Sequence, residues 1–283
     1  AEGTFAQGDG SWMVSARRGY LDLVFTLMNQ NDIPSPLYYD IFSKVRYQLN
    51  PRNTVAFNVL HARDSYTFDA AGTTGFQDTV KTHELANNRY GNSYAWMTHT
   101  GIFGPKASVQ TLASIGLIKR DRDGTEFYTA TTGAMYEVAD RRDLTVLGLK
   151  QDWSLDASRN LFFESGFDLR RQEVDYGINN KVWRNLDDPS PDPLALYPVE
   201  TTRSQKETGT TFATYLTGRV RPADALTLSA GARYDRSSYV NDSHISPRLN
   251  ARVDLTPRTN LKLGWGHYRQ FQGLEQIDAL DPQ

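Results

Sequence analysis

The sequence predicts an all-β fold, an antiparallel up-and-down transmembrane β-barrel of which about eleven strands are present. Three observations predict it. Apolar and polar residues alternate over runs of ten or more residues, short connections between the runs interleave with long ones, and no apolar run approaches the roughly 20 residues of a membrane helix. A helical membrane protein is therefore excluded, whereas a barrel is not, because alternate residues of its strands face water.

The alternation is clearest between residues 225 and 271. One face of the segment that ends at Leu255 carries Ile245, Leu249 and Val253, and the other carries Arg248 and Arg252. Successive side chains of a strand point to opposite faces, so one face is apolar and the other polar. The same signal predicts strands, in chain order, at Ser11–Phe25, Leu37–Leu49, Thr54–Tyr66, Tyr90–Ile102, Ala107–Arg120, Asp143–Leu155, Asn160–Val174, Glu207–Val220, Leu226–Asp235, Ile245–Leu255 and Leu261–Gly266.

The connections fall into two interleaved classes. The short ones are the turns Asn50–Asn53, Phe103–Lys106, Asp156–Arg159, Arg221–Asp224 and Thr256–Thr259. The others are Met28–Pro36, Thr67–Arg89, Asp121–Arg142, Asp175–Lys206 and the brief Asn241–Ser243. Short turns on the periplasmic rim and long loops on the extracellular rim are typical of outer-membrane barrels, and a soluble sandwich has no reason to keep this parity.

Composition narrows the function classes. The mean hydropathy of -0.56 and the 12% aromatic content are compatible with polar inward faces and aromatic interface girdles. The net charge of -2 gives no electrostatic basis for binding nucleic acid. The absence of Cys excludes a disulfide framework and a thiolate metal site.

The predicted barrel is incomplete for two reasons. Closed bacterial barrels have an even number of strands, whereas about eleven are predicted here. The sequence also ends at Asp281-Pro282-Gln283 without a final strand that finishes in an aromatic residue. We expect either a strongly curved antiparallel sheet with unpaired first and last strands or a smaller closed barrel.

Two blocks of the sequence carry a family resemblance. Gly10–Leu23 resembles the early barrel segment of TonB-dependent outer-membrane receptors, and Gly231–Asp235, Ile245–Arg252, Leu255–Pro257 and Leu263–Phe271 resemble their mid-barrel hairpin. The resemblance implies a barrel of about 22 strands that is closed by a plug domain. Residues 1–283 would then be part of the barrel domain, without the plug and the C-terminal strands.

The resemblance also implies a function and a location. The protein would import a scarce nutrient, a ferric siderophore or another large solute, across the bacterial outer membrane. Its partners would be outer-membrane lipid, the nutrient and, through the missing plug domain, TonB. A passive porin has the same strand pattern and stays an alternative, as does a soluble or adhesive β-protein.

Candidate ligand contacts come from loops and from the polar strand faces. Trp183 and Tyr197 lie in a predicted extracellular loop, as either ligand-stacking or loop-packing residues. Six arginines of the polar strand faces would line the lumen, namely Arg233, Arg248 and Arg252 and likewise Arg46, Arg170 and Arg219. There they would contact an anionic ligand or the plug, or they would pair across strands with the acidic residues Glu164, Asp168, Asp235 and Asp254. The adjacent Arg17 and Arg18 mark a bulge or the end of a membrane strand. Recognition is expected on the loops 67–89, 121–142 and 175–206.

Neither catalysis nor a bound cofactor is predicted. The five histidines, His61, His83, His99, His244 and His267, lack ligand spacing, and no nucleophile or nucleotide motif is present. The acidic run Asp187–Pro193 offers oxygen ligands for calcium, although its spacing is not that of an EF-hand and solvated surface is the simpler interpretation.

Aromatic residues of the apolar faces are predicted to contact lipid or to anchor the membrane interface. They are Trp12, Tyr20, Tyr39, Tyr47, Phe57, Trp96, Phe163 and Trp265.

Overall fold

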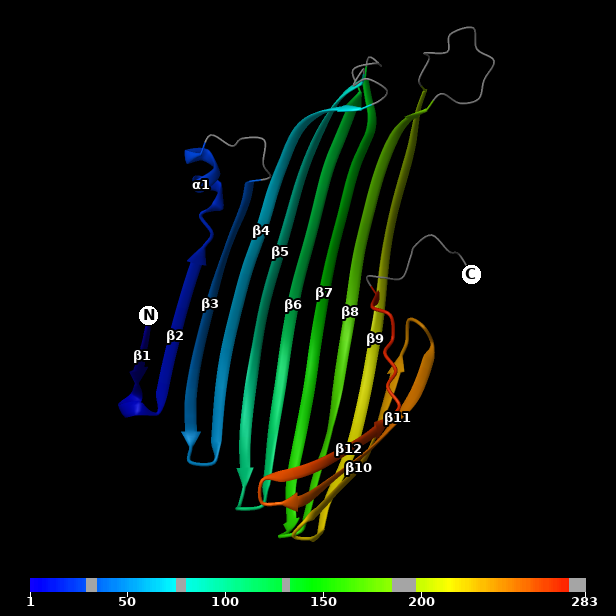
Figure 1. Ribbon diagram of the computed structural model, residues 1–283. Helices are drawn as coiled ribbons and strands as arrows, with labels where there is room; N and C mark the ends of the chain where they lie inside the picture. Colours follow the sequence, from blue (N-terminus) through cyan, green and yellow to red (C-terminus); the bar gives the residue numbers. More distant parts are fainter. Residues whose placement is uncertain (29–34, 75–79, 129–132, 185–196, 275–283) are drawn as a thin grey trace.

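The computed structural model describes residues 1–28, 35–74, 80–128, 133–184 and 197–274. It shows one sheet of 12 antiparallel strands in sequence order (Figure 1). The strands are β1 (Glu2–Phe5), β2 (Gly10–Arg18), β3 (Ser35–Asn50), β4 (Asn53–Thr74), β5 (Val80–Phe103), β6 (Ala107–Tyr128), β7 (Gly133–Ser158), β8 (Leu161–Arg184), β9 (Tyr197–Ala223), β10 (Leu226–Ser237), β11 (Asp242–Thr256) and β12 (Thr259–Gly266). Two short helices, the 3₁₀ helix η1 (Ala6–Gly8) and α1 (Leu21–Leu27), lie near the N-terminus.

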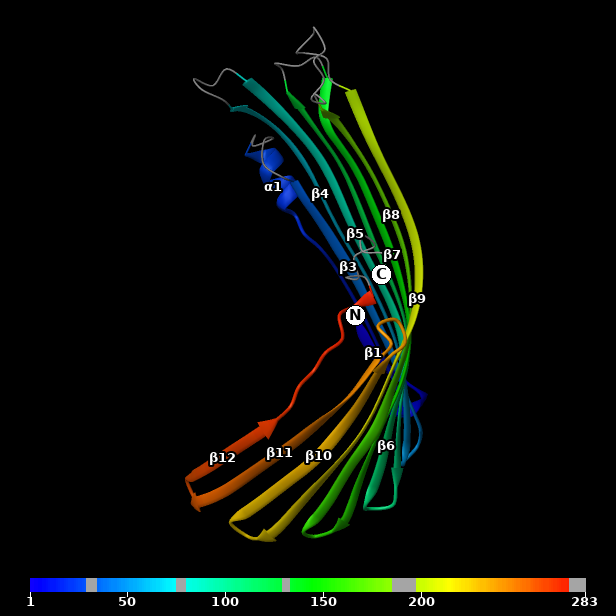
Figure 2. The same ribbon diagram turned by 90° about the vertical axis from the view of Figure 1, so that its right-hand side faces the viewer.

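The sheet is curved and does not close (Figure 2). Its edges are β1 and β12, which are not paired with each other in the described part of the chain. The expectation of a curved sheet with unpaired edges is therefore confirmed, and that of a smaller closed barrel is wrong. The extra strand, β1, has four residues, too few to show an alternation.

The first predicted strand is shorter than expected. It ends as β2 at Arg18, and α1 follows where Ser11–Phe25 was expected to stay extended. Apolar residues occur at Leu23, Val24 and Phe25 in succession, which a strand with one wet face does not favour. Since β2 and β3 pair without a register shift, Arg17 and Arg18 mark the end of a strand and not a bulge.

The long predicted loops are mostly strand. The β4–β5, β6–β7 and β8–β9 pairs continue through large parts of 67–89, 121–142 and 175–206, and these six strands have 22 to 27 residues each. Polar residues are frequent on both faces there, so the hydrophobic alternation ends while the backbone ladder goes on. The short turns confirm the parity of the connections, because all five lie at one end of the sheet (Figure 1).

The convex face carries an apolar band next to these turns. In β8 it comprises Leu161, Phe163, Phe167 and Leu169, and it gives way to charge at Arg171. The neighbouring strands repeat the pattern with exposed side chains, such as Leu216 at 58% and Trp265 at 60%. The band spans about nine to eleven residues, or roughly 30 Å along a strand. The sheet forms one layer in the described residues, so these side chains do not enter the dry core of a soluble sandwich.

Two of the eight predicted lipid-facing aromatics lie elsewhere. Trp96 is paired with Asn58 and Ser114, and its ring centroid is 6.1 Å from that of Phe42. Directly paired residues share a face, which places Trp96 on the concave side. Tyr20 lies outside the sheet, immediately before α1. The other six are on the convex face, as predicted.

Glycines on the concave face let aromatic rings cross neighbouring strands. A Cβ at Gly166 would lie 2.5 Å from the carbonyl oxygen of Gln151 and 2.8 Å from the ring of Tyr215. The Tyr215 hydroxyl donates a hydrogen bond to Asp152 at 2.7 Å, which holds the ring in place. Tyr94 covers Gly116 in the same manner.

Gly166→Ala is expected to destabilise the sheet by about 1–3 kcal/mol, because the new methyl group overlaps a backbone oxygen that the ladder holds in place. Gly177→Ala, in the same strand, is the matched control, since no heavy atom lies within 4 Å of its Cβ position. Urea unfolding of the two variants of the whole protein in detergent checks this. Equal midpoints for both variants would contradict it.

Among the residues that the structure describes, neither helix has the length and apolar character of a membrane-spanning segment.

Candidate functional site

The predicted ligand contacts fall into two separate regions. Arg233 and Arg248 line one cavity on the concave face, whereas Arg252 lies on the same face of β11 but nearer the short turn. Trp183 and Tyr197 lie at the far ends of β8 and β9, where Trp183 pairs with Pro198 and Tyr197 with Arg184. From Asp168 in the cavity to Trp183 is about 50 Å along β8. The cavity therefore contains only two of the five predicted residues.

The cavity has a volume of about 500 Å³. Its walls come from β8, β9, β10 and β11 and from the segment after β12, which runs on the concave side of the sheet (Figure 2). The lining residues are Asp168, Arg170, Gln172, Thr211, Phe212, Ala213, Arg233, Asp235, Arg236, Tyr239, His244, Ser246, Arg248, Tyr268, Arg269, Gln270, Phe271 and Gly273.

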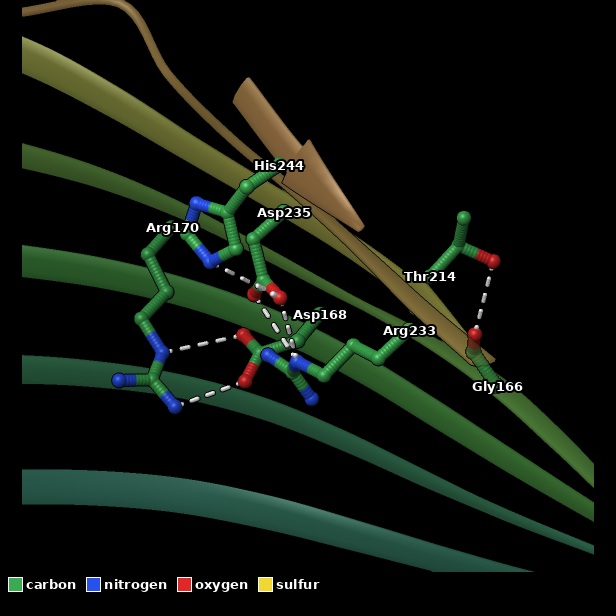
Figure 3. A network of polar contacts seen from close by, with 7 residues as sticks. All are labelled: Gly166, Asp168, Arg170, Thr214, Arg233, Asp235 and His244. Carbon is green, nitrogen blue, oxygen red and sulfur yellow. Dashed lines mark hydrogen bonds and ion pairs between the residues drawn. The ribbon is translucent and has the colours of Figure 1, made fainter. Parts of the chain in front are cut away.

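Ion pairs within single strands shape the cavity floor (Figure 3). Arg170 donates two hydrogen bonds to Asp168, at 3.0 and 2.7 Å. Arg233 Nε donates to both oxygens of Asp235, at 2.9 and 3.1 Å. Residues i and i+2 share a face about 7 Å apart, which suits a long arginine reaching back to a short aspartate.

The same spacing recurs along the concave face. Arg252 pairs with Asp254, Arg142 with Asp140 and Lys150 with Asp152, each at 2.9 Å. For Asp168, Asp235 and Asp254, the arginine pairs that were predicted across strands are therefore pairs along strands. The signal was present in the sequence as a basic and an acidic residue two positions apart. All six arginines predicted for the lumen do lie on the concave face, as the strand registers show.

Cross-strand ion pairs occur on both faces. Arg17 pairs with Asp40 on the concave face, and other pairs lie on the convex face beyond the apolar band. Lys206 lies 2.6 Å from Glu173, and Lys119 lies 3.7 Å from Asp143 on the adjacent strand. The hydrogen bond from Lys206 lowers the pKa of Glu173, and the same bond raises the pKa of Lys206. These side chains are solvated, so each pair contributes little stability.

Two polar side chains of the cavity are buried and have an atom without a hydrogen-bond partner in the described part of the chain. His244 is 8% exposed and Ser246 is 1% exposed, and the atoms concerned are Nε2 of His244 and Oγ of Ser246. His244 Nε2 lies 3.8 Å from Asp235, within reach of an ion pair but too far for a hydrogen bond. Sequence reasoning missed both residues, although their spacing places them on the same face as Arg248.

Further from the short turns, the concave face is rich in aromatic and cationic residues. One register row runs from Tyr90 through Arg120 and Arg142 to Tyr176. The Arg142 guanidinium lies 4.8 Å from the centre of the Tyr176 ring. Sequence reasoning missed this row because it assigned part of it to loops.

No cluster of His, Cys, Asp and Glu suited to a metal ion occurs among residues that the structure describes. The acidic run 187–193, considered for calcium, lies outside the described residues.

An open meander with an apolar convex face and a charged concave face is part of the wall of a large antiparallel β-barrel. Residues 7–279 match the family described as TonB dependent receptor-like, beta-barrel, and the chain belongs to this family. The resemblance seen in the sequence is thereby confirmed. The family consists of bacterial outer-membrane receptors, not of enzymes.

Three solved structures resemble the chain at low sequence identity. FpvA of P. aeruginosa, bound to heterologous pyoverdines, has a TM-score of 0.61 and 11% identity over 93% of this chain and 39% of its own. The RagAB peptide transporter has a TM-score of 0.57 and 8% identity over 91% and 35%. The siderophore receptor PiuA from Acinetobacter baumannii has a TM-score of 0.52 and 10% identity over 94% and 43%.

The chain therefore spans less than half the length of each of these three structures. At such identities the likeness shows the fold alone. Comparison with curated protein sequences gives no match.

Proposed function

We propose that the chain forms part of the barrel of a receptor that imports a scarce nutrient across the bacterial outer membrane, with energy supplied through TonB. The observation that carries the proposal is the family match over residues 7–279, on a sheet whose two faces suit lipid and water respectively. The apolar band would contact the hydrocarbon of the membrane. The longer strands would rise beyond the outer leaflet by roughly 40 Å.

A plug domain and further barrel strands would belong to the rest of the whole protein. The small share of the compared structures that the chain covers supports this division. Coupling to TonB would pass through the plug, so residues 1–283 would supply the wall, the recognition surface and part of the lumen.

A ferric siderophore is the nutrient that we propose. Two of the compared structures are named for siderophore chemistry, FpvA with its pyoverdines and PiuA as a siderophore receptor. The row from Tyr90 to Tyr176 supports this choice, because aromatic rings and guanidinium groups suit large, anionic, aromatic chelates.

The test is uptake of ⁵⁵Fe from a panel of ferric siderophores by cells that contain or lack the whole protein. We expect at least one chelate to accumulate about tenfold more in cells with the protein. A protonophore and the loss of TonB should each remove the difference. Uptake that persists under both treatments would instead support a passive porin. Equal uptake of every chelate by cells with and without the protein would contradict siderophore import.

A further inference from the structure

The cavity on the concave face of β8–β11 has more cationic groups than its carboxylates can neutralise. Its arginines include Arg170, Arg233, Arg248 and Arg269, against two aspartates. Arg236 also borders the cavity, but its register with Phe212 places it on the convex face. Asp168 and Asp235 are engaged by Arg170 and Arg233 (Figure 3). Arg248 faces the ring of Tyr268 at 5.0 Å, and within the described residues no carboxylate forms an ion pair with it. Arg248 therefore places a cationic group, without an ion-pair partner among the described residues, on the β11 side of the cavity.

The same side presents buried donors. His244 and Ser246 precede Arg248 at two-residue intervals, so all three point to the concave face. His244 and Ser246 line a cavity whose other lining residues include Arg170, Arg233 and Arg248, and the unpartnered atoms of both residues are buried. Buried polar groups are nearly always hydrogen-bonded, and these two atoms have no hydrogen-bond partner among the residues that the structure describes. A bound group that accepts hydrogen bonds would satisfy them.

The chemistry of the wall defines the class of ligand. A guanidinium donates in a planar fork that matches phosphate, sulfate or carboxylate, and a hydroxyl or imidazole N–H adds a donor to the same oxygens. The volume of about 500 Å³ is that of a small-molecule site and exceeds the needs of a single side-chain carboxylate.

We propose that Arg248, His244 and Ser246 bind an oxyanion of a dissolved ligand on the lumenal wall. The inference rests on the proposed function, in that the bound group would belong to a solute on its way through the barrel. It places a second contact deep in the wall, apart from the recognition surface of the extended strands.

The experiment measures binding of inorganic phosphate to the purified whole protein by calorimetry, at ionic strength held constant with chloride. We expect a saturable isotherm with one site. Arg248→Gln should raise Kd by about ten- to a hundredfold, the range for a hydrogen bond to a charged group. Arg252→Gln is the matched control, because Arg252 shares the strand and face but pairs with Asp254 outside the cavity. Its Kd should stay within about twofold of the wild type.

Ser246→Ala provides a second variant, which removes one hydroxyl and no charge. Heat-modifiable migration on gels establishes that each variant is folded. If Arg248→Gln does not fold, a Kd raised several-fold by Ser246→Ala supports the site. The absence of a saturable isotherm, or equal weakening by Arg252→Gln, would overturn the proposal. Phosphate binding without nutrient import would instead leave the site intact and reject the proposed function.

Discussion

Leu216→Arg is expected to lower strongly the yield of barrel that assembles in the membrane. Leu216 lies in the apolar band on the convex face of β9 and is 58% exposed. If this face contacts hydrocarbon, an arginine near the midplane of the bilayer lowers the stability of the folded barrel by about 2–4 kcal/mol. That cost is a large fraction of the stability of an ordinary domain. The measurement is the yield of heat-modifiable, folded protein in isolated outer membranes.

Thr208→Arg in the same strand is the control. Thr208 lies on the same face but beyond the band, and the register places it opposite Glu173. The same substitution there should leave the yield of folded protein unchanged, because its charge stays in water. Equal yields for both variants would show that height along the strand does not matter and would contradict the membrane assignment.

Shortening the β8–β9 pair is expected to abolish uptake while the barrel still assembles. Gly177 and Ser204 are directly paired, so replacing residues 178–203 with an Asn-Gly turn keeps the register below the cut. The change removes Trp183 and Tyr197 but retains the contact of Arg142 with Tyr176 and the whole cavity. Uptake of ⁵⁵Fe should fall to that of cells without the protein, and the yield of folded barrel should stay within about twofold.

A deletion of Thr214 alone serves as the positive control for loss of assembly. Removing one residue from a strand moves the following side chains to the opposite face, so Leu216 and Val220 would turn toward the polar side. Unchanged uptake by the shortened protein would show that recognition lies below the cut, on the row from Tyr90 to Tyr176 or at the cavity.

The sequence predicted the membrane-level part of the fold because alternation there is imposed by two different solvents. Leu249 and Leu263 face one way and Arg248 and Lys262 the other, and this contrast is legible without any partner strand. The prediction of strands from alternation failed beyond the apolar band, because Arg171 and Glu173 there are as polar as their neighbours on the other face. Strand continuation there depends on pairing with adjacent strands, which a single segment does not reveal.

The face on which Trp96 lies could not be predicted from its own strand either. Its hydrophobicity suggested lipid, yet the register with Asn58 and Ser114 sets its face. Within β5, Ala95 and Met97 are also apolar, so the local pattern was ambiguous. Only pairing with the neighbouring strands decides which set of alternate residues faces lipid.

By itself, the sequence determined the all-β class, the parity of its connections, the faces of the lumenal arginines and the family resemblance. All of these follow from period-two patterning or from short turn-forming segments. Only the tertiary structure decided the length of the central strands, the position of His244 3.8 Å from Asp235 on the adjacent strand, and the presence of His244 and Asp168 in one cavity. The physical reason is that register between strands, set by backbone hydrogen bonds over long sequence separations, determines which side chains become neighbours.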